Sequence, residues 1–576
     1  MAITQEKPLR VLIFGASGII GQHMMLTLPW NVKPLYARFR LSDSFRGRFT
    51  ILDVTNFEWV EAIIKSFNPD VIVNLAGENN VDTVEREPER WRAVNVEFPS
   101  RLAEYCCLAP RIDLIHVSTQ GIFDGKEPPY APCVYHGDPV NAYGCQKLLA
   151  EHRVMSANPQ AVIVRPTFVL GVRPMVTCGR HNPLEQMFEM DEQLQVNDRY
   201  FSPVMAIDVA EEIWNLCFVL GNVGYGHPND YVRGAIFHAG LPIRTTRYDL
   251  AIRVDALEES VYRKIEAVPH SHFKGIAERP KDTTYVDDGK DSSGVSTSLH
   301  MNHENALQIG LLHAMDQMDA RNDLFSEVGF AEDIALFLGH SYDWVLHELK
   351  NGFQHFHAEV ANDFREYVLD YTQEEILAWY KRTEAYIWEL ACFQQDCSGF
   401  NYRGMCRGIM ETLSAHLRGD SSTFKDVLVL GDGIGTLSLY LIQNGFDAHY
   451  HDLRESRTAA FASFRAKRRG IGLRYFWAKE GTFIPAFDGA KKFDCILALD
   501  YFEHLPNVVE WLHAVYAMLK DGGRFMARNA FAQGSGITGS IPCHLPETDH
   551  FVSDWDAACK RVGFQHEINE WYIKKS

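Results

Sequence analysis

Two glycine-rich turns, more than four hundred residues apart, constrain the fold of this chain more than any other feature. In each turn an apolar run breaks into closely spaced glycines and continues into an amphipathic segment, over residues 11–21 and 427–435. This order is typical of a parallel strand that leads into a helix whose N-terminus binds a nucleotide. The sequence therefore predicts two nucleotide-cofactor sites.

The length of 576 residues fits two domains, because a single hydrophobic core rarely organises so long a chain. We expect a first domain over residues 1–318, a helical connector over 319–374 and a second domain over 375–576. Residues 281–298 are polar and rich in glycine and serine, which predicts a loop. Residues 320–418 show helical periodicity instead of strand alternation.

Charge and cysteine usage narrow the class of protein. The formal net charge of −19 argues against a nucleic-acid-binding protein, since such proteins need a basic face to displace counterions from phosphates. No apolar run approaches the length of a membrane span, and the N-terminus lacks an apolar signal core, so we expect a cytoplasmic protein with no membrane partner. The 12 cysteines are scattered without a Cys-x-x-Cys pair, which indicates reduced thiols and no metal site.

After the first glycine turn, short apolar runs alternate with helical stretches. This alternation is the pattern of a doubly wound α/β domain with a parallel sheet. The expected strands are residues 32–36, 50–54, 71–76, 114–118 and 162–166. With the second turn included, we expect an α/β protein with two Rossmann-like doubly wound domains joined by a helical connector.

The spacing Gly15-x-x-Gly18-x-x-Gly21 resembles that of the extended short-chain dehydrogenase/reductases. The resemblance implies that Asp53, at the end of the third expected strand, binds the adenine amino group. A helix N-cap beside Thr55 is the alternative role for Asp53. The resemblance further implies cofactor contacts from Gly15, Ser17, Gly18, Ile19, Gly21, Val54, Leu75, Ala76 and Gly77.

Further motifs narrow the resemblance to the dTDP-4-dehydrorhamnose reductases. Residues 80–96 and 116–125 follow that family's sequence, and Tyr143-x-x-x-Lys147 comes about two dozen residues later. Tyr-x-x-x-Lys alone arises about once by chance in a chain of this length. The motif is informative here because it follows the other matching motifs in the order that the family has. The resemblance covers about residues 8–315.

The chemistry of carbonyl reduction explains why these residue types belong together. Hydride addition leaves an alkoxide, and Tyr143 is the candidate to protonate it. One helical turn later, the Lys147 ammonium is expected to lower the phenol pKa and to hold the nicotinamide ribose. Thr119 would donate a hydrogen bond to the substrate oxygen. The alternative is a buried tyrosine on a helix, a solvated lysine and an ordinary strand threonine.

Two stretches bear on cofactor and substrate. The second strand ends in Arg38 and Arg40 instead of an acidic residue, which favours the 2′-phosphate of NADPH and leaves NADH as the alternative. Residues 77–79 read Gly-Glu-Asn where the reductases usually have Ala-Tyr-Thr, and Gln120-Gly121 replaces Asp-Tyr. These positions are expected on the substrate side, so a ketosugar nucleotide is one option among small-molecule substrates.

From residue 425 the pattern resembles the class I S-adenosylmethionine-dependent methyltransferases. The resemblance rests on the second glycine turn, on residues 493–505 and on residues 519–525. It implies that Asp452 binds both ribose hydroxyls of S-adenosylmethionine. Val429 stands where the family commonly has an acidic residue, and Asp432 is the candidate to replace it. The implied contacts are Gly431, Asp432, Gly433, Gly435, Asp452, Leu453 and Asp500.

Methyl transfer to an alcohol needs one well-placed base, and transfer to an acidic acceptor needs little such help. His504 after the fourth strand is the candidate base, with His544 or His550 in the later loop as alternatives. Histidines in such loops are more often structural or solvated. The acceptor atom stays open.

These features together predict a bifunctional biosynthetic enzyme, an NADPH-dependent ketoreductase fused to a methyltransferase that acts on the same small molecule. One alternative is a regulatory scaffold, because the reductase family includes a non-catalytic subunit that binds a methionine adenosyltransferase. Another is an epimerase with tightly held cofactor. A homo-oligomer is compatible with the sequence.

Overall fold

The computed structural model places the chain in two compact units. Met1–Asp319 with Gly339–Tyr342 form the first, and Ala320–Leu338 with Asp343–Ser576 form the second. The residues that the structure describes are 8–29, 31–38, 49–109, 112–130, 137–174, 182–222, 232–257, 263–285, 306–370, 372–398, 401–417, 426–482, 484–487, 489, 491–502, 508–528, 555–568 and 570–575.

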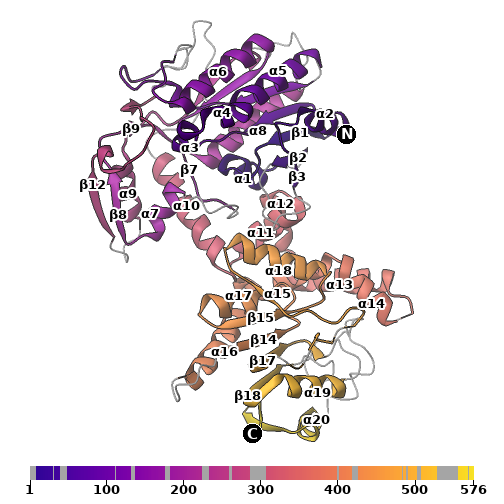
Figure 1. The fold of residues 1–576 in the computed structure, drawn as a ribbon. Helices are drawn as coiled ribbons and strands as arrows, with labels where there is room; N and C mark the ends of the chain where they lie inside the picture. The colour runs from indigo at the N-terminus through magenta and orange to yellow at the C-terminus, as the bar shows by residue number, and fades with distance from the viewer. Residues whose placement is uncertain are drawn as a thin grey trace. The chain divides into compact units, whose positions relative to one another are not determined.

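The first unit is built on a parallel sheet of seven strands in the order β11-β6-β5-β4-β1-β2-β3. Figure 1 labels β1, β2 and β3 among them. The chain's first strand lies inside the sheet and the order reverses there, which is the doubly wound arrangement. The strands are β1 (Leu9–Phe14), β2 (Val32–Arg38), β3 (Phe49–Ile51), β4 (Val71–Asn74), β5 (Asp113–Val117), β6 (Val162–Pro166) and β11 (Ile236–Ala239).

Helices cover both faces of this sheet. Leu12 and Phe14 of β1 share a buried cluster with α2, α5 and α6, while α1 and α8 pack together on the opposite face. Burial on both faces explains why the strands appear in the sequence as continuous apolar runs. The helices are α1 (Ile19–Leu26), α2 (Phe57–Phe67), α3 (Val81–Arg86), α4 (Pro88–Arg92), α5 (Phe98–Leu108), α6 (Ala142–Ala157) and α8 (Ala206–Asn222).

A smaller part of the first unit is assembled from three short parallel strand pairs, β7 with β10, β8 with β12 and β9 with β13. The expected loop at 281–298 starts with β13, and beyond Tyr285 it lies outside the described residues. The elements are β7 (Phe168–Leu170), α7 (Pro183–Glu189), β8 (Glu192–Val196), β9 (Tyr200–Phe201), β10 (Pro203–Met205), α9 (Arg247–Asp255), β12 (Lys264–Val268), β13 (Asp282–Thr283) and α10 (Ala306–Asn322).

The second unit has its own seven-stranded sheet, in the order β16-β15-β14-β17-β18-β20-β19. Its pairs are parallel except for β18 with β20 and β20 with β19. The two α/β units confirm the predicted fold class. The elements are β14 (Asp426–Leu430), α17 (Thr436–Gln443), β15 (Asp447–His451), α18 (Arg457–Arg468), β16 (Arg474–Tyr475), β17 (Phe493–Leu499), α19 (Val508–Met518), β18 (Leu519–Arg528), α20 (Trp555–Val562), β19 (Phe564–Ile568) and β20 (Trp571–Lys574).

A helical layer precedes this sheet in the chain and shares its core. Val360, Phe364 and Trp379 belong to one buried cluster with Leu428 and Phe493 of the sheet. Most of the segment expected to be a connector, residues 319–374, therefore lies within the second unit. The helices are α11 (Glu327–Ile334), α12 (Tyr342–Leu349), α13 (Gly352–Tyr367), α14 (Gln373–Arg382), α15 (Ala385–Gln394) and α16 (Tyr402–Leu417). Among the described helices, none combines the length and apolar character needed to cross a bilayer.

Candidate functional site

The first glycine turn joins β1 to α1 and is shaped by a close approach of backbones. Gly15 has a φ of +79°, and a Cβ there would lie 2.5 Å from the backbone nitrogen of Ala76. Only glycine avoids both problems. The N-cap of α1 is Gly18, which has no side chain to satisfy the first amide groups of the helix. The turn therefore fits a bound dinucleotide, whose phosphates such amide groups can hold.

The other residues expected to contact the nicotinamide cofactor gather around this turn. Ser17 lies in the turn, Ile19 and Gly21 belong to α1, and Leu75 to Gly77 directly follow β4, the neighbour of β1. Val54 comes three residues after β3 and is buried.

Asp53 forms a local turn with the residue two positions on. Its Oδ1 accepts hydrogen bonds from the Thr55 backbone nitrogen at 2.9 Å and from Thr55 Oγ1 at 2.7 Å. The alternative role of Asp53 as a helix N-cap is wrong, because the residue that caps α2 is Asn56. The cofactor role of Asp53 stays a prediction. Arg38 closes β2, while its side chain and the whole of Arg40 lie outside the described residues.

Of the three expected catalytic residues, Thr119 lies two residues after β5, and Tyr143 and Lys147 lie on α6. A Cβ at Gly121 would lie 3.4 Å from Thr119 Oγ1 and 3.6 Å from Tyr143 Cε1, so these two side chains meet around Gly121. One helical turn after Tyr143, Lys147 Nζ donates to the carbonyl oxygen of Val117 at 2.8 Å, at the end of β5. The structure thus brings Thr119, Tyr143 and Lys147 to one edge of the sheet.

The start of α6 is held by several contacts. The Asn141 side chain accepts a hydrogen bond from the Gly144 backbone nitrogen at 2.9 Å and donates to the carbonyl of Glu278 at 2.8 Å. Glu85 accepts from the backbone nitrogen of Ala142 at 2.8 Å. These contacts fix the helical turn that carries Tyr143.

Burial dominates the electrostatics of this centre. It raises the pKa of Tyr143 to about 12, with the Glu78 charge adding to the rise and a hydrogen bond with Thr119 opposing it. Burial lowers the pKa of Lys147 to about 8, against the attraction of Glu151. The expectation that Lys147 lowers the Tyr143 pKa is wrong for this structure, because desolvation of the phenol prevails and the ammonium binds the Val117 carbonyl. Tyr143 is therefore protonated at neutral pH.

Glu78, one of the positions expected on the substrate side, makes contacts in this centre that the sequence did not reveal. It is 4% exposed, and its Oε1 accepts from the backbone nitrogen of Asn80 at 2.9 Å. Its own backbone nitrogen donates to Asn95 Oδ1 at 2.8 Å, and Asn95 Nδ2 donates to Gln146 Oε1 of α6 at 3.0 Å. This chain of contacts ties the loop after β4 to the helix that carries Tyr143.

Gln120 does not line the substrate side as expected. It is buried, and its Nε2 lies 3.4 Å from His238 Nδ1 on β11. His238 in turn contacts Arg165 Nη1 at 3.2 Å, and Arg165 pairs with Glu151. Gln120 thus extends a buried polar cluster beneath the catalytic edge.

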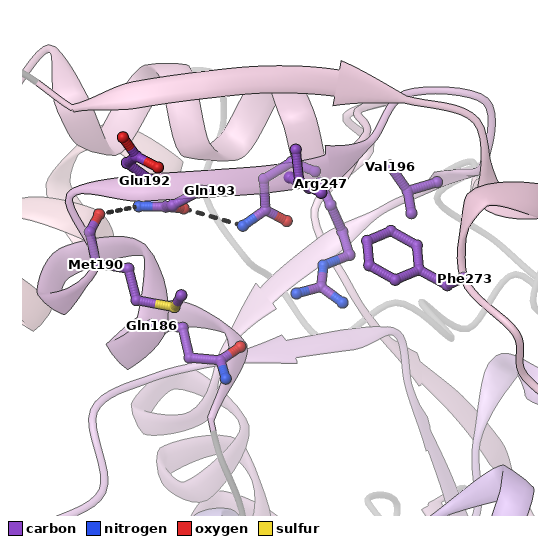
Figure 2. Close-up of a pocket in the computed structure, with 9 residues that line it drawn as sticks. Gln186, Met190, Glu192, Gln193, Val196, Arg247 and Phe273 are labelled. Atoms are coloured by element: carbon purple, nitrogen blue, oxygen red, sulfur yellow. Dashed lines mark hydrogen bonds between the residues drawn. The ribbon is translucent and has the colours of Figure 1, made fainter.

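The smaller part of the first unit contains a cavity of about 410 Å³ between α7, β8 and α9 (Figure 2). The Arg247 guanidinium points into it beside the ring of Phe273. Burial lowers the pKa of Arg247, and its Nε lacks a hydrogen-bond partner among the described residues. An arginine in this setting suits an anionic group of a ligand. Sequence reasoning missed it, because a lone arginine after a helix cap carries no local signal.

The second glycine turn joins β14 to α17. Gly431, Gly433 and Gly435 all have positive φ, at +61°, +49° and +79°. A Cβ at Gly431 would lie 2.1 Å from a ring carbon of Tyr501. Val429 is buried in the core of the sheet, so its position offers no acid to a ligand.

Asp432 bends back onto α17. Its carboxylate accepts from the backbone nitrogens of Leu437 at 3.2 Å and Ser438 at 2.7 Å, and burial raises its pKa to about 6. It therefore braces the glycine turn instead of standing free to replace the acid missing at Val429.

Asp452 follows β15 and faces the same turn. Its Oδ1 accepts from the Leu453 backbone nitrogen at 2.6 Å, and its Oδ2 lies 2.9 Å from the Tyr450 hydroxyl, which also reaches the Gly433 carbonyl at 2.7 Å. Burial raises the Asp452 pKa to about 7, and the Asp432 charge contributes. Asp500 follows β17 with a φ of +47°, and burial raises its pKa against the pull of Arg528. An acidic rim of this kind fits the cationic S-adenosylmethionine.

The remaining sequence expectations for this unit concern histidines and metals. His504, His544 and His550 lie outside the described residues. Within the described ranges, one group of possible metal ligands has its atoms within 4.8 Å of one another, namely Asp426, Asp447 and His449. Lysine and arginine side chains already pair with its two carboxylates, so an ion-pair cluster accounts for it.

Comparison with known proteins matches both units. Residues 9–294 match the family model described as RmlD substrate binding domain, and residues 428–525 match the one described as Methyltransferase domain.

Relatives of the first unit include reductases and a methionine adenosyltransferase subunit. The chain is 28% identical to a dTDP-4-keto-6-deoxy-D-glucose reductase of Streptomyces niveus, over 50% of this chain and 93% of the relative. It is 33% identical to methionine adenosyltransferase 2 subunit beta of Xenopus tropicalis, over 48% and 77%. It spans about half the length, 54%, of the probable low-salt glycan biosynthesis reductase Agl14 of Haloferax volcanii, at 32% identity over 28% of this chain.

Among solved structures, a dTDP-4-dehydrorhamnose reductase from Clostridium acetobutylicum is 22% identical, with a TM-score of 0.43, over 54% of this chain and 100% of that one.

Proposed function

The chain belongs to the RmlD substrate binding domain family through residues 9–294 and carries a methyltransferase domain at residues 428–525, and on this premise we propose that it is a bifunctional biosynthetic enzyme. Its first unit reduces a keto group with NADPH, and its second unit methylates the same small molecule with S-adenosylmethionine. The observation that carries this proposal is the meeting of Thr119, Tyr143 and Lys147 in a chain that also has an acid-lined glycine turn.

In the reduction, a bound nicotinamide nucleotide would supply the hydride. Tyr143 keeps its proton at neutral pH because its pKa is about 12, so it is ready to protonate the alkoxide that the substrate becomes. The Thr119 hydroxyl, which faces the same phenol, stabilises the negative charge on that oxygen. Lys147 holds α6 against the end of β5 through the Val117 carbonyl, at the side where the cofactor ribose would bind.

The substrate is a nucleotide-linked sugar or a related metabolite with an anionic group. Support comes from the Arg247 guanidinium in the cavity of the smaller part, which suits a phosphate. The reductase of Streptomyces niveus, whose name specifies a dTDP-linked keto sugar, points the same way. Glu78 near Tyr143 departs from the reductase pattern, so the sugar ring itself is expected to differ from dehydrorhamnose.

In the second unit, S-adenosylmethionine would supply the methyl group. Asp452 lies at the strand end where a carboxylate accepts hydrogen bonds from both ribose hydroxyls. Asp500 and Asp452 add negative charge that favours the cationic methyl donor over its neutral-sulfur product. The hydroxyl formed by reduction is one acceptor, and the carbon beside the ketone before reduction is the other. We place this activity in the cytoplasm.

One experiment tests the whole proposal. The full chain is incubated with deuterium-labelled NADPH, methyl-labelled S-adenosylmethionine and dTDP-4-dehydro-6-deoxyhexoses, beside a metabolite extract of producer cells. A product that carries both labels in its mass spectrum supports coupled reduction and methylation. If only the methyl label appears, the reduction is refuted, and an absence of NADPH oxidation with a changed stereocentre would favour an epimerase.

A second candidate function rests on the similarity to methionine adenosyltransferase 2 subunit beta. In that case the first unit is a scaffold that binds a methionine adenosyltransferase, the enzyme class that makes the methyl donor. Tyr143→Phe separates the two functions. The reductase proposal expects this variant to abolish product in cells, whereas a scaffold would tolerate the loss of one hydroxyl.

A further inference from the structure

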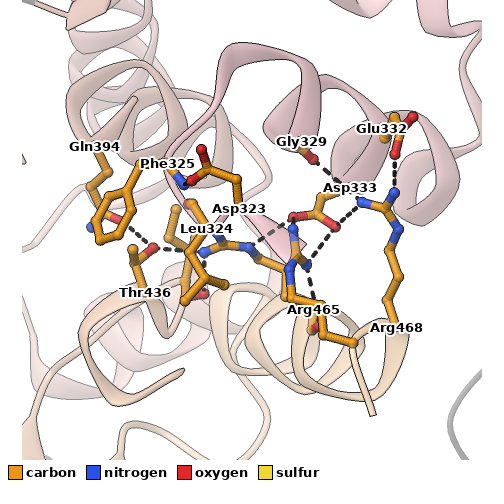
Figure 3. A network of polar contacts seen from close by, with 12 residues as sticks. Asp323, Leu324, Phe325, Gly329, Glu332, Asp333, Gln394, Thr436, Arg465 and Arg468 are labelled. Carbon is orange, nitrogen blue, oxygen red and sulfur yellow. Dashed lines mark hydrogen bonds and ion pairs between the residues drawn. The ribbon is translucent and has the colours of Figure 1, made fainter. Parts of the chain in front are cut away.

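A fully buried ionic network joins α11 to α18 within the second unit (Figure 3). Its centre is Asp333 on α11, whose Oδ2 accepts from Arg465 Nε at 3.0 Å and whose Oδ1 accepts from Arg468 Nη1 at 2.7 Å. Arg469 donates to both oxygens at 2.9 Å, and Glu332 pairs with Arg468. Buried charges of this kind are costly to hold unless every group is paired.

Arg465 extends this network to the second glycine turn. Its Nη1 donates to the Ile434 carbonyl at 3.0 Å and to Thr436 Oγ1 at 2.6 Å. Its Nη2 donates to the Leu324 carbonyl at 2.9 Å. Ile434 lies between the last two glycines of the turn, and Thr436 opens α17.

A residue of α15 also contacts the turn. The Thr436 hydroxyl donates to Gln394 Oε1 of α15 at 2.5 Å while it accepts from Arg465. Arg465 of α18 and Gln394 of α15 therefore both contact the Thr436 hydroxyl, while Asp333 of α11 holds the Arg465 guanidinium, as Figure 3 shows.

The network carries one more positive than negative charge, and the balancing carboxylate lies in the glycine turn. The arginines at 465, 468 and 469 face the carboxylates of Glu332 and Asp333, so one positive charge is unmatched within the network. The attraction between Arg465 and Asp432 supplies the balance from inside the glycine turn. Although burial alone would raise it, the three guanidinium groups hold the pKa of Asp333 well below its usual range.

We propose that Arg465, held by Asp333, is a positioning residue of the methyl-donor site. Each of its three nitrogens donates to a protein acceptor and the side chain is fully buried, so it acts through the turn and not on the ligand. By fixing the Ile434 carbonyl and the Thr436 hydroxyl it holds the turn in the shape that binds the donor, which reduces the cost of ordering it. The inference rests on the proposed methyltransferase function.

The test compares Arg465→Met with Arg468→Met in the full chain. Both variants remove one guanidinium from the network. The acceptors described for Arg468 are Glu332, Asp333 and the Gly329 carbonyl, none of which belongs to the turn. The dissociation constant for S-adenosylhomocysteine is measured by calorimetry at a temperature where thermal unfolding shows both variants folded. We expect both to melt earlier, with binding weakened at least about tenfold by Arg465→Met and at most about twofold by Arg468→Met.

Equal weakening in the two variants would overturn the inference, because the network would then act through stability alone. If the unchanged protein fails to bind S-adenosylhomocysteine, the proposed methyltransferase function is refuted instead.

A milder pair of variants covers the case in which Arg465→Met does not fold. Thr436→Val keeps the side-chain volume and removes the hydroxyl that Arg465 and Gln394 contact, whereas Thr436→Ser keeps that hydroxyl. We expect the valine variant to bind S-adenosylhomocysteine several-fold more weakly and the serine variant to match the unchanged protein. Unaltered binding by the valine variant would overturn the inference.

Discussion

The ionisation of Asp452 should control how tightly the second unit binds an adenosine ligand. Burial raises the pKa of this carboxyl group to about 7 in the ligand-free protein. Only the ionised group offers acceptor lone pairs on both oxygens for the two ribose hydroxyls. Binding is therefore expected to weaken as pH falls through 7, where the site takes up a proton.

The size of the effect follows from the pKa. With a pKa of about 7, the ionised fraction falls from about nine-tenths at pH 8 to about one-tenth at pH 6. If only the ionised form binds, the apparent dissociation constant rises about tenfold over this interval, or about 1.4 kcal/mol. Asp432 has a pKa of about 6, so its titration adds to the change only at the acid end.

The assay uses 5′-methylthioadenosine as ligand, because it keeps both ribose hydroxyls but lacks the carboxylate and the titrating ammonium of S-adenosylmethionine. Dissociation constants are measured by calorimetry from pH 5.5 to 8.5. Asp452→Asn is expected to bind weakly, with an affinity that does not change between pH 6 and 8. Asp432→Asn is expected to keep the pH dependence but to move it to lower pH, because the Asp432 charge helps to raise the Asp452 pKa. Affinity that stays constant over this range in the unchanged protein would refute the reasoning, and so would a pH dependence near 7 that persists in Asp452→Asn.

Three further outcomes are expected. Tyr143→Phe removes the proton donor and should lower kcat for NADPH oxidation, followed by absorbance, by about 10²–10⁴ with little change in KM, and a loss below about tenfold would contradict that role. Gly431→Ala places an L-residue at positive φ, which costs about 1–2 kcal/mol of stability, and brings its Cβ to 2.1 Å from the Tyr501 ring. Calorimetry should show a larger loss of stability than for the control Gly445→Ala, since Gly445 also has positive φ but, among the described residues, nothing beyond its chain neighbours lies within 4 Å of the added Cβ. Glu151→Gln removes the carboxylate that pairs with the Arg165 guanidinium, which is 1% exposed. This variant should lower the free energy of unfolding of the first unit by about 3–5 kcal/mol in denaturant titrations. An unchanged unfolding midpoint would argue against a stabilising role for this pair.

Much of the fold could be predicted because its determinants are local. The predicted strand at residues 162–166 coincides with β6, and the one at 32–36 lies within β2. Strands buried on both faces must be apolar along their whole length, so they stand out from the surrounding helices. The two glycine turns could be predicted for a similar reason. The positive φ at Gly15 and Gly431 strongly favours glycine, so the requirement is visible in the local sequence.

The helices before the second sheet were harder to assign to a domain. Their periodicity predicted helices, but periodicity does not say which sheet an apolar face covers. In the structure Phe364 and Trp379 pack into the core of the second sheet, which makes these helices part of that unit.

Contacts between charged residues could not be predicted at all. Arg465 and Asp333 are 132 residues apart in the chain, and isolated arginines and aspartates are usually solvated. Likewise nothing local to Glu78 indicates that its charge acts on Tyr143. Such pairs depend on how distant elements pack.

The cofactor sites depend on backbone geometry and the proposed substrate site on individual side chains, and this difference limits which substrates would fit. The cofactor side of each unit is made by backbone geometry, which repeats among proteins that bind the same cofactor and leaves a pattern of glycines. The proposed substrate side depends on single side chains, Glu78 beside Tyr143 and Arg247 in its cavity, each carried by a separate loop or helix. Because both are charged, the substrate should carry an anionic group at one end and hydrogen-bond donors at the end that reacts. Substrates that lack either group should therefore lose kcat/KM, and Arg247→Met should erase the preference for the anionic group while Glu78→Gln should not.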